Sequence, residues 1–235
     1  SSSSAASDVY KRQVIIGRHT NIYPERYRGI KNNTVIISDW HKLKDLKGYL
    51  TQYLPESVYY DRNVYENLGI CGKCELKKIK CWKCRNFAGQ ELAFDIDPEN
   101  ISCPYHGDWS RKMKSQRGLS FCMYEFNIVK RQTAKLYEEL KKNYSKLEIV
   151  YSGRGFHIHV FDEDAYKLTT QYRNKLANEL VKRYAIDEWV TAGEMRLIRL
   201  PYSLHGMVSR ICVPVKKGEL IHFDPRTNKA CIPKF

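Results

Sequence analysis

The stretch "QELAFDIDPEN", residues 90–100, alternates apolar and polar side chains with a period of two. This alternation predicts a β-strand with one face against the core. Asp95 and Asp97, two positions apart, should then project to the same side of the strand. Two neighbouring carboxylates repel each other and lose water on burial. A pair of Mg²⁺ or Mn²⁺ ions would make the arrangement favourable, as in enzymes of phosphoryl transfer, whereas the alternative is two exposed acids at a strand end.

The composition predicts one compact domain with a basic surface. The chain has 235 residues, 43% of them hydrophobic, and a net charge of +14. That charge favours polyanionic partners, chiefly nucleic acid. No long uncharged apolar run predicts a membrane span, and residues 1–13 lack the apolar centre of a secretory signal. We expect residues 1–13 to be a non-native or disordered leader and residues 14–235 to form the domain.

Strand and helix patterns are interleaved along the chain, which favours the α+β class. Intervals of three and four between apolar residues predict amphipathic helices at 122–144 and 168–184. A shorter helical pattern covers 41–53. Strands are predicted at 35–37, on both sides of a glycine turn within 147–162, and in short pieces between 196 and 215.

The glycine turn carries a second candidate site, "YSGRGFHIHV", at residues 151–160. Its two glycines permit a tight turn and close approach to a ligand. Arg154 between them suits a phosphate group. His157 and His159 share one face of the following strand, where they either contact a nucleotide or serve as satisfied core histidines.

A third candidate stretch, "IDEWVTAGEMRLIRLPYSLHG", spans residues 186–206. Arg199 lies among apolar neighbours and needs an anionic partner. That partner is either a nucleotide triphosphate or a structural ion pair with Asp187 or Glu194. His205 follows, directly before a glycine.

Together the three stretches resemble the catalytic small subunit of the archaeo-eukaryotic DNA primases. The "ELAFDID", "SGRGFH" and "RLIRLPYSLHG" motifs occur in that family's order and spacing. The resemblance covers about residues 35–228. It implies the family's α+β core, a mixed sheet flanked by helices, with a small zinc-binding insertion at 70–86.

The resemblance also implies a reaction and its residues. Template-directed primer synthesis on single-stranded DNA would use nucleoside triphosphates, two Mg²⁺ or Mn²⁺ ions and an RNA or DNA primer end. The implied metal ligands are Asp95, Asp97 and Asp187. The implied nucleotide-binding residues are Ser152, Arg154, His157, Arg199 and His205. The family further implies a large subunit with an iron–sulfur domain, and a cytoplasmic, nucleoid-associated location in an archaeal-type cell.

Four cysteines form a CxxC–x6–CxxC pattern, which is a strong signal for zinc. They are Cys71, Cys74, Cys81 and Cys84. Disulfides are the alternative, and the missing secretory signal disfavours them.

A second, incomplete ligand set consists of Cys103, His106 and Cys122. The resemblance implies a structural zinc there, just after the Asp-x-Asp strand, and the fourth ligand must come from elsewhere. Either two zinc sites exist or one site mixes both sets. Cys212 and Cys231 are expected to be core thiols.

Two other functions share these motifs. One is a primase-polymerase of a mobile element or repair pathway. The other is an inactive zinc-containing module that binds nucleic acid, against which the presence of all three aspartates argues.

Overall fold

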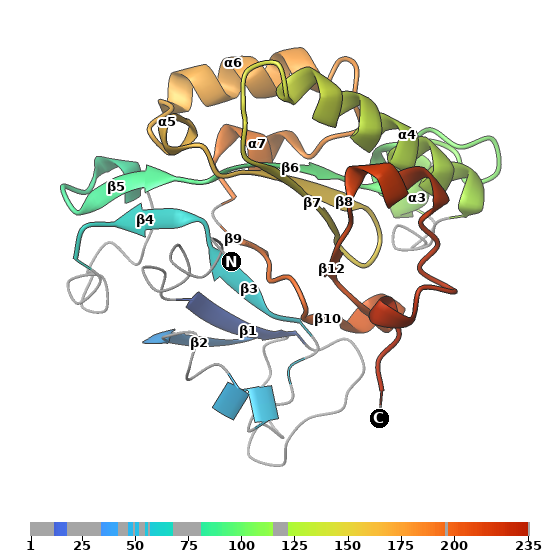
Figure 1. Ribbon diagram of the computed structural model, residues 1–235, viewed down its shortest axis with the longest axis horizontal. Helices are drawn as coiled ribbons and strands as arrows, with labels where there is room; N and C mark the ends of the chain where they lie inside the picture. Colours follow the sequence, from blue (N-terminus) through green and yellow to red (C-terminus); the bar gives the residue numbers. More distant parts are fainter. Residues whose placement is uncertain are drawn as a thin grey trace.

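The computed structural model describes residues 12–17, 34–41, 47–48, 50–51, 55, 57–67, 81–114, 122–195 and 197–234. The fold is α+β, as predicted. A four-stranded sheet of order β12-β7-β8-β6 lies beneath a layer of helices, and short strand pairs lie on its other side (Figure 1). All pairings among the described strands are antiparallel, whereas the resemblance implied a mixed sheet.

The elements alternate along the chain as the sequence patterns indicate. The strands are β1 (Arg12–Gly17), β2 (Thr34–His41), β3 (Tyr59–Asp61), β4 (Asn63–Tyr65), β5 (Phe87–Gln90), β6 (Leu92–Ile96), β7 (Leu147–Tyr151), β8 (Phe156–Val160), β9 (Leu197–Arg199), β10 (Leu204–His205), β11 (Arg210–Ile211) and β12 (Val213–Pro214). The α-helices are α3 (Trp109–Lys114), α4 (Met123–Leu140), α5 (Glu163–Tyr166), α6 (Thr170–Leu180) and α7 (Glu188–Ala192). The short 3₁₀ helices are η2 (Cys81–Lys83), η3 (Pro98–Asn100), η4 (Gly206–Val208), η5 (Lys217–His222) and η6 (Lys229–Cys231).

The alternation in β6 sorts its side chains between two layers. Leu92, Phe94 and Ile96 are fully buried in the main core, which α4 covers from above (Figure 1). Ala93 faces the other way and packs with Tyr60 in a smaller cluster. Burial of each large apolar side chain contributes about 1.5–3 kcal/mol, so a one-residue slip of register would be costly. The polar side of β6 is therefore held on the face opposite the main core.

Helix α4 begins one residue after Cys122, which occupies the N-cap position. The predicted helix extended to residue 144, but the α-helix ends at Leu140 and continues as a turn. Helix α6 is likewise shorter than predicted and is capped by Thr169, whose side chain accepts a hydrogen bond from the Tyr172 amide. In the described part of the chain, no helix is long and apolar enough to cross a bilayer.

Several predicted segments lie partly or wholly outside the described residues. Strand β1 begins at Arg12, inside the predicted leader, and pairs antiparallel with β2, where Arg12 lies opposite His41. The predicted helix at 41–53 is seen only as helical residues at 47–48 and 50–51. The predicted insertion is closed at its base by two hydrogen bonds of 2.7 Å. The Asn67 backbone amide donates to Asn86 Oδ1, and Asn86 Nδ2 donates to the Asn67 carbonyl.

Candidate active site

Strand pairing places the first acidic residue of the site. Asp95 lies opposite His157 in the β6–β8 register, on the face away from the main core. The two side chains approach to 3.5 Å between Asp95 Oδ1 and His157 Nε2. Asp97 follows directly after β6 with an extended backbone. Asp95 and Asp97 therefore both lie on extended backbone two residues apart, as the strand pattern predicted.

The third aspartate is brought in by a segment that runs antiparallel to the end of β6. The Asp187 amide donates to the Asp95 carbonyl at 2.8 Å, and the Asp97 amide donates to the Ala185 carbonyl at 3.3 Å. A bridge between Ile96 and Ile186 lies between these bonds. Asp187 Oδ1 caps α7 by accepting from the Trp189 amide. Residues 92 positions apart in sequence are thus held side by side.

The electrostatics of this centre favour cation binding. Burial, together with the charges of Asp97, Asp187 and Glu99, raises the pKa of Asp95 well above its usual value. Burial also raises the pKa of Asp97 to about 6, although Arg154 opposes this. Asp95 Oδ1 is buried without a hydrogen-bond partner in the described structure. Carboxylates in this condition either take up protons or bind hard cations, so this donor set fits Mg²⁺ or Mn²⁺.

The glycine loop is wedged between the acidic centre and His205. A Cβ added to Gly155 would lie 2.1 Å from the Ile96 carbonyl oxygen and 2.7 Å from Asp97 Oδ1. Gly153 has φ +106°, and a Cβ there would lie 2.5 Å from His205 Cβ. Ser152 closes the turn, because its hydroxyl accepts from the Gly155 amide at 3.1 Å. Both glycines are therefore required for the loop to approach the aspartates.

Arg154 projects from this loop toward the turn after β6. Both terminal nitrogens of Arg154 donate to Glu99 Oε2 at 3.2 Å. Glu99 was not among the site residues predicted from the sequence, although its position two residues after Asp97 could have suggested it. Any phosphate contact by Arg154 would have to share the guanidinium with this carboxylate.

Arg199 is the last residue of β9, which pairs with β3. It donates to the Ser57 hydroxyl at 2.9 Å and to the Tyr59 hydroxyl at 2.8 Å, and it stacks on the Tyr59 ring at 4.7 Å. Neither Asp187 nor Glu194 is among its hydrogen-bond or ion-pair partners in the described structure. Its positive charge acts on both Asp95 and Asp97, which places it near the acidic centre.

The two histidines of β8 have different surroundings. Burial, His159 and Arg199 lower the pKa of His157 well below its usual value, so His157 is neutral beside Asp95. His159 belongs to a buried network in which its Nδ1 lies 2.6 Å from Glu91 Oε1. The Tyr60 hydroxyl also donates to Glu91, at 2.8 Å. His159 is therefore a core histidine held through Nδ1, while its buried Nε2 has no hydrogen-bond partner in the described structure.

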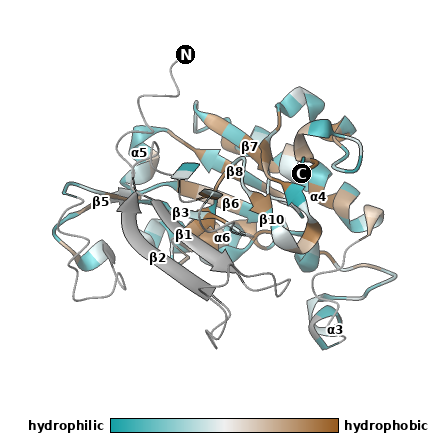
Figure 2. Ribbon diagram, turned by 90° about the horizontal axis from the view of Figure 1, so that it is seen from below, coloured by the Kyte–Doolittle hydropathy of each residue, from teal (hydrophilic) through white to brown (hydrophobic). Residues whose placement is uncertain are grey.

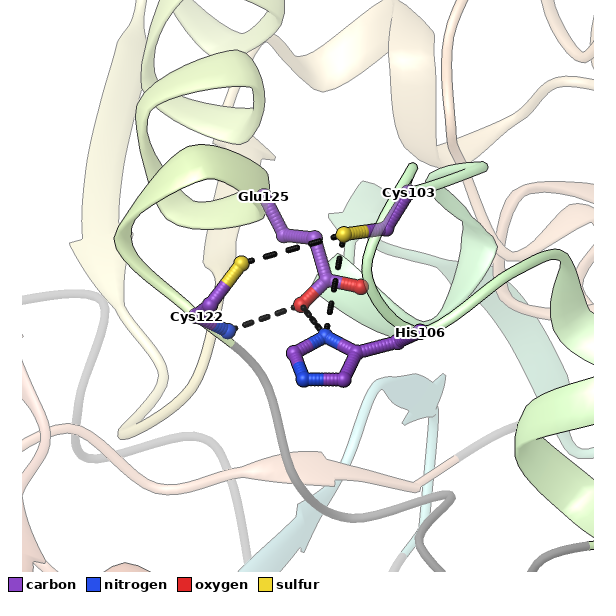
Figure 3. Close-up of side chains that lie close together, drawn as sticks. All are labelled: Cys103, His106, Cys122 and Glu125. Atoms are coloured by element: carbon purple, nitrogen blue, oxygen red, sulfur yellow. Dashed lines mark hydrogen bonds and ion pairs between the residues drawn. The ribbon is translucent and has the colours of Figure 1, made fainter.

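A second group of ligands lies beyond the turn after β6. Its members are Cys103, His106, Cys122 and Glu125, whose ligand atoms all lie within 4.8 Å of one another (Figure 3). The two sulfurs are 3.8 Å apart, and Cys103 Sγ lies 3.7 Å from His106 Nδ1. A tetrahedral zinc site, with bonds of about 2.3 Å to sulfur and about 2.0 Å to nitrogen or oxygen, separates its ligand atoms by roughly 3.4–3.8 Å. This group fits such an ion.

Glu125 is a candidate for the fourth ligand, which the sequence alone did not assign. It lies one helical turn after Cys122, at the third position of α4, so the two side chains share one end of the helix. Its Oε2 lies 3.2 Å from His106 Nδ1 and accepts from the Cys122 amide at 2.8 Å. A helix start at Cys122 was predicted, and residue spacing alone could have suggested this glutamate.

The remaining cysteines divide between core and insertion. Cys212 and Cys231 are fully buried, which confirms the core prediction. Cys71 and Cys74 lie outside the described residues, as does the side chain of Cys81, and Cys84 is half-buried and unpaired as a thiol. The four-cysteine zinc site stays a prediction.

Comparison with known proteins agrees with this geometry. No family model matches the chain. An uncharacterized DNA primase small subunit-like protein of Archaeoglobus fulgidus is 58% identical over 224 residues, covering 94% of this chain and 78% of that protein. The DNA primase small subunits of Pyrobaculum arsenaticum and Pyrococcus horikoshii are 26% and 27% identical and cover 77% and 57% of this chain.

These alignments span 66% and 33% of the two primase small subunits. The polymerase domain of Mycobacterium tuberculosis ligase D, solved in complex with DNA, superposes with a TM-score of 0.51 at 12% identity, covering 91% of this chain and 76% of that chain. This likeness shows a shared fold. Sequence identity above one half across nearly the whole chain shows that it belongs to the archaeo-eukaryotic DNA primase small-subunit family.

Proposed function

We propose that this protein is a template-directed nucleotidyltransferase that synthesises primers on single-stranded DNA. Family membership supports a primase-like function and nucleotidyl transfer in general. The observation that carries the specific proposal is the backbone pairing of the Asp187 segment with the end of β6, which brings Asp187 beside Asp95 and Asp97 from a distant part of the chain.

Each part of the site has a role in this reaction. Asp95, Asp97 and Asp187 would hold two Mg²⁺ or Mn²⁺ ions, which supply charge neutralisation on the reacting phosphates. The 3′-hydroxyl of one nucleotide attacks the α-phosphorus of the next, and pyrophosphate leaves. The residues of the chain bind and orient the substrates, as positioning and electrostatics dominate phosphoryl transfer.

The nucleotide-binding residues surround the acids. The glycine loop, which carries Ser152 and Arg154, packs closely against Asp97 at Gly155. Arg199, held in orientation by Ser57 and Tyr59, would face the triphosphate. His157, being neutral, would donate a hydrogen bond through Nε2 rather than a full positive charge.

Zinc is the ion we propose for the Cys103–His106–Cys122–Glu125 group, because two thiolates and an imidazole favour it over Mg²⁺ or Mn²⁺. It would tie the segment after β6 to the start of α4. Its contribution would be folding energy, since structural zinc sites stabilise the folded state outright.

The test is unprimed synthesis on single-stranded template with ribo- or deoxynucleotides and Mn²⁺. Asp95→Asn and Asp187→Asn should abolish product, while Asp164→Asn, an exposed carboxylate change on α5, should not. Full activity in either site variant would refute the metal assignment. Synthesis only from an added primer would favour the primase-polymerase alternative, and no synthesis by the wild type would favour the inactive binding module.

Two further expectations stay predictions. A large iron–sulfur subunit would be detected by co-purification with the tagged chain from its native cells. A cytoplasmic, nucleoid-associated location would be checked by microscopy in the same cells.

A further inference from the structure

Lys112 of α3 lies between the turn after β6 and the start of α4 and contacts both. It is 1% exposed, although it carries a charged ammonium group. Its Nζ lies 2.5 Å from Glu125 Oε1. It also donates to the carbonyl oxygens of Ile101 at 2.6 Å and Pro98 at 2.9 Å. A lysine is buried in this way only when its donors are fully satisfied, and here they are.

The carbonyls that Lys112 holds belong to the turn directly after Asp97. Asp97 is the N-cap residue of η3, and η3 contains Glu99, which pairs with Arg154. The glycine loop that carries Arg154 packs in turn against the end of β6. Holding this turn therefore sets the positions of both Asp97 and Arg154.

Glu125 connects Lys112 to the candidate metal group. One of its carboxylate oxygens, Oε2, faces His106 and the Cys122 amide (Figure 3). The other, Oε1, faces Lys112. Lys112 Nζ and Glu125 Oε1 are both buried, so this contact holds the carboxylate in one orientation. Fixing Oε2 would fix the orientation of Oε1 as well.

We propose that Lys112 is a positioning residue that couples the Cys103–His106–Cys122–Glu125 group to the acidic centre. Metal bound by the Cys103–His106–Cys122–Glu125 group would orient Glu125, and Glu125 would hold Lys112. Lys112 would in turn hold the turn that begins at Asp97 and contains Glu99. The inference rests on the proposed function only in that the acidic centre binds divalent cations.

The first measurement is Mn²⁺ affinity, followed by electron paramagnetic resonance of the free ion. Lys112→Met should weaken Mn²⁺ binding about tenfold, the lower end of the effect seen when groups supporting a metal ligand are removed. The matched control is Lys130→Met. Lys130 is also buried and also donates to two carbonyls, of Ile221 and Phe223 at 3.1 Å, but it holds no part of the turn after Asp97.

The second measurement is amide hydrogen exchange in segments 98–101 and 152–155. Lys112→Met should accelerate exchange in both segments more than Lys130→Met does. Removing zinc from the wild type with a chelator should accelerate exchange in the same two segments. In Lys112→Met the chelator should cause no further acceleration, because both changes remove the same set of contacts.

The proposal stands if Mn²⁺ affinity falls and exchange accelerates in Lys112→Met beyond the Lys130→Met control. It is overturned if either quantity stays within twofold of the wild type, or if the control shows an equal change. Should Asp95→Asn leave wild-type Mn²⁺ affinity unchanged, the proposed function fails at the acidic centre. Hydrogen exchange alone then decides the coupling.

Discussion

Replacing Asp97 with asparagine should stabilise the protein at neutral pH in the absence of divalent cations, and change its stability little near pH 4. Burial and the carboxylates of Glu99 and Asp187 raise the pKa of Asp97 from 3.8 to about 6, against the opposing charges of Arg154 and Arg199. Between these pH values the folded state binds more protons than the unfolded state. The free energy of unfolding of the wild type therefore falls as pH rises.

The magnitude follows from the size of this shift. The rise of the Asp97 pKa from 3.8 to about 6 corresponds to about 3 kcal/mol at pH 7. This is an upper figure, because the Asp97 side chain is only half-buried. Asparagine keeps the shape of the protonated acid and cannot ionise. For a domain of this size the gain corresponds to an increase in Tm of at most about 6–12 °C.

Thermal unfolding followed by circular dichroism from pH 4 to pH 8 would measure the difference, in buffer freed of Mg²⁺ and Mn²⁺ by ion exchange. Asp164→Asn is the control, because its carboxylate is exposed. The wild-type and Asp97→Asn curves should diverge between pH 4 and pH 7, and added Mn²⁺ should stabilise the wild type more than the variant. Parallel curves across the whole range would refute the reasoning.

Three other changes test separate parts of the site. Gly155→Ala should abolish synthesis and lower the free energy of unfolding by about 2 kcal/mol or more, since its Cβ would lie 2.1 Å from the Ile96 carbonyl; Gly218→Ala, with open space around it, should stay within about 0.5 kcal/mol of wild type in denaturant titrations. Cys122→Ser should reduce bound zinc by about one ion per chain in elemental analysis, and unchanged zinc content would contradict the ligand assignment. Arg199→Ala should raise the nucleotide KM about tenfold in steady-state assays, while an unchanged KM would remove this residue from the triphosphate site.

Features that depend on neighbouring residues could be predicted from the sequence. The period-two pattern of β6 placed Asp95 and Asp97 on one side, because successive side chains of an extended backbone alternate between faces. The helix at 122–144 was located by its spacing and differs from α4 by a few residues at its ends. The glycine turn before β8 was predicted for the same local reason, since glycine permits the positive φ found at Gly153.

Which residues of these motifs meet in space depends on contacts between segments distant in sequence, and a local pattern does not predict such contacts. Asp187 reaches Asp95 through a backbone hydrogen bond across the edge of the sheet, and Glu125 joins Cys103 and His106 because α4 packs beside the turn after β6. Local dihedral preferences act over a few residues, whereas these contacts arise from burial of the whole apolar face of the sheet. The sequence by itself therefore determined the elements and most of the chemistry that they carry, and only the tertiary structure decided which of those groups meet.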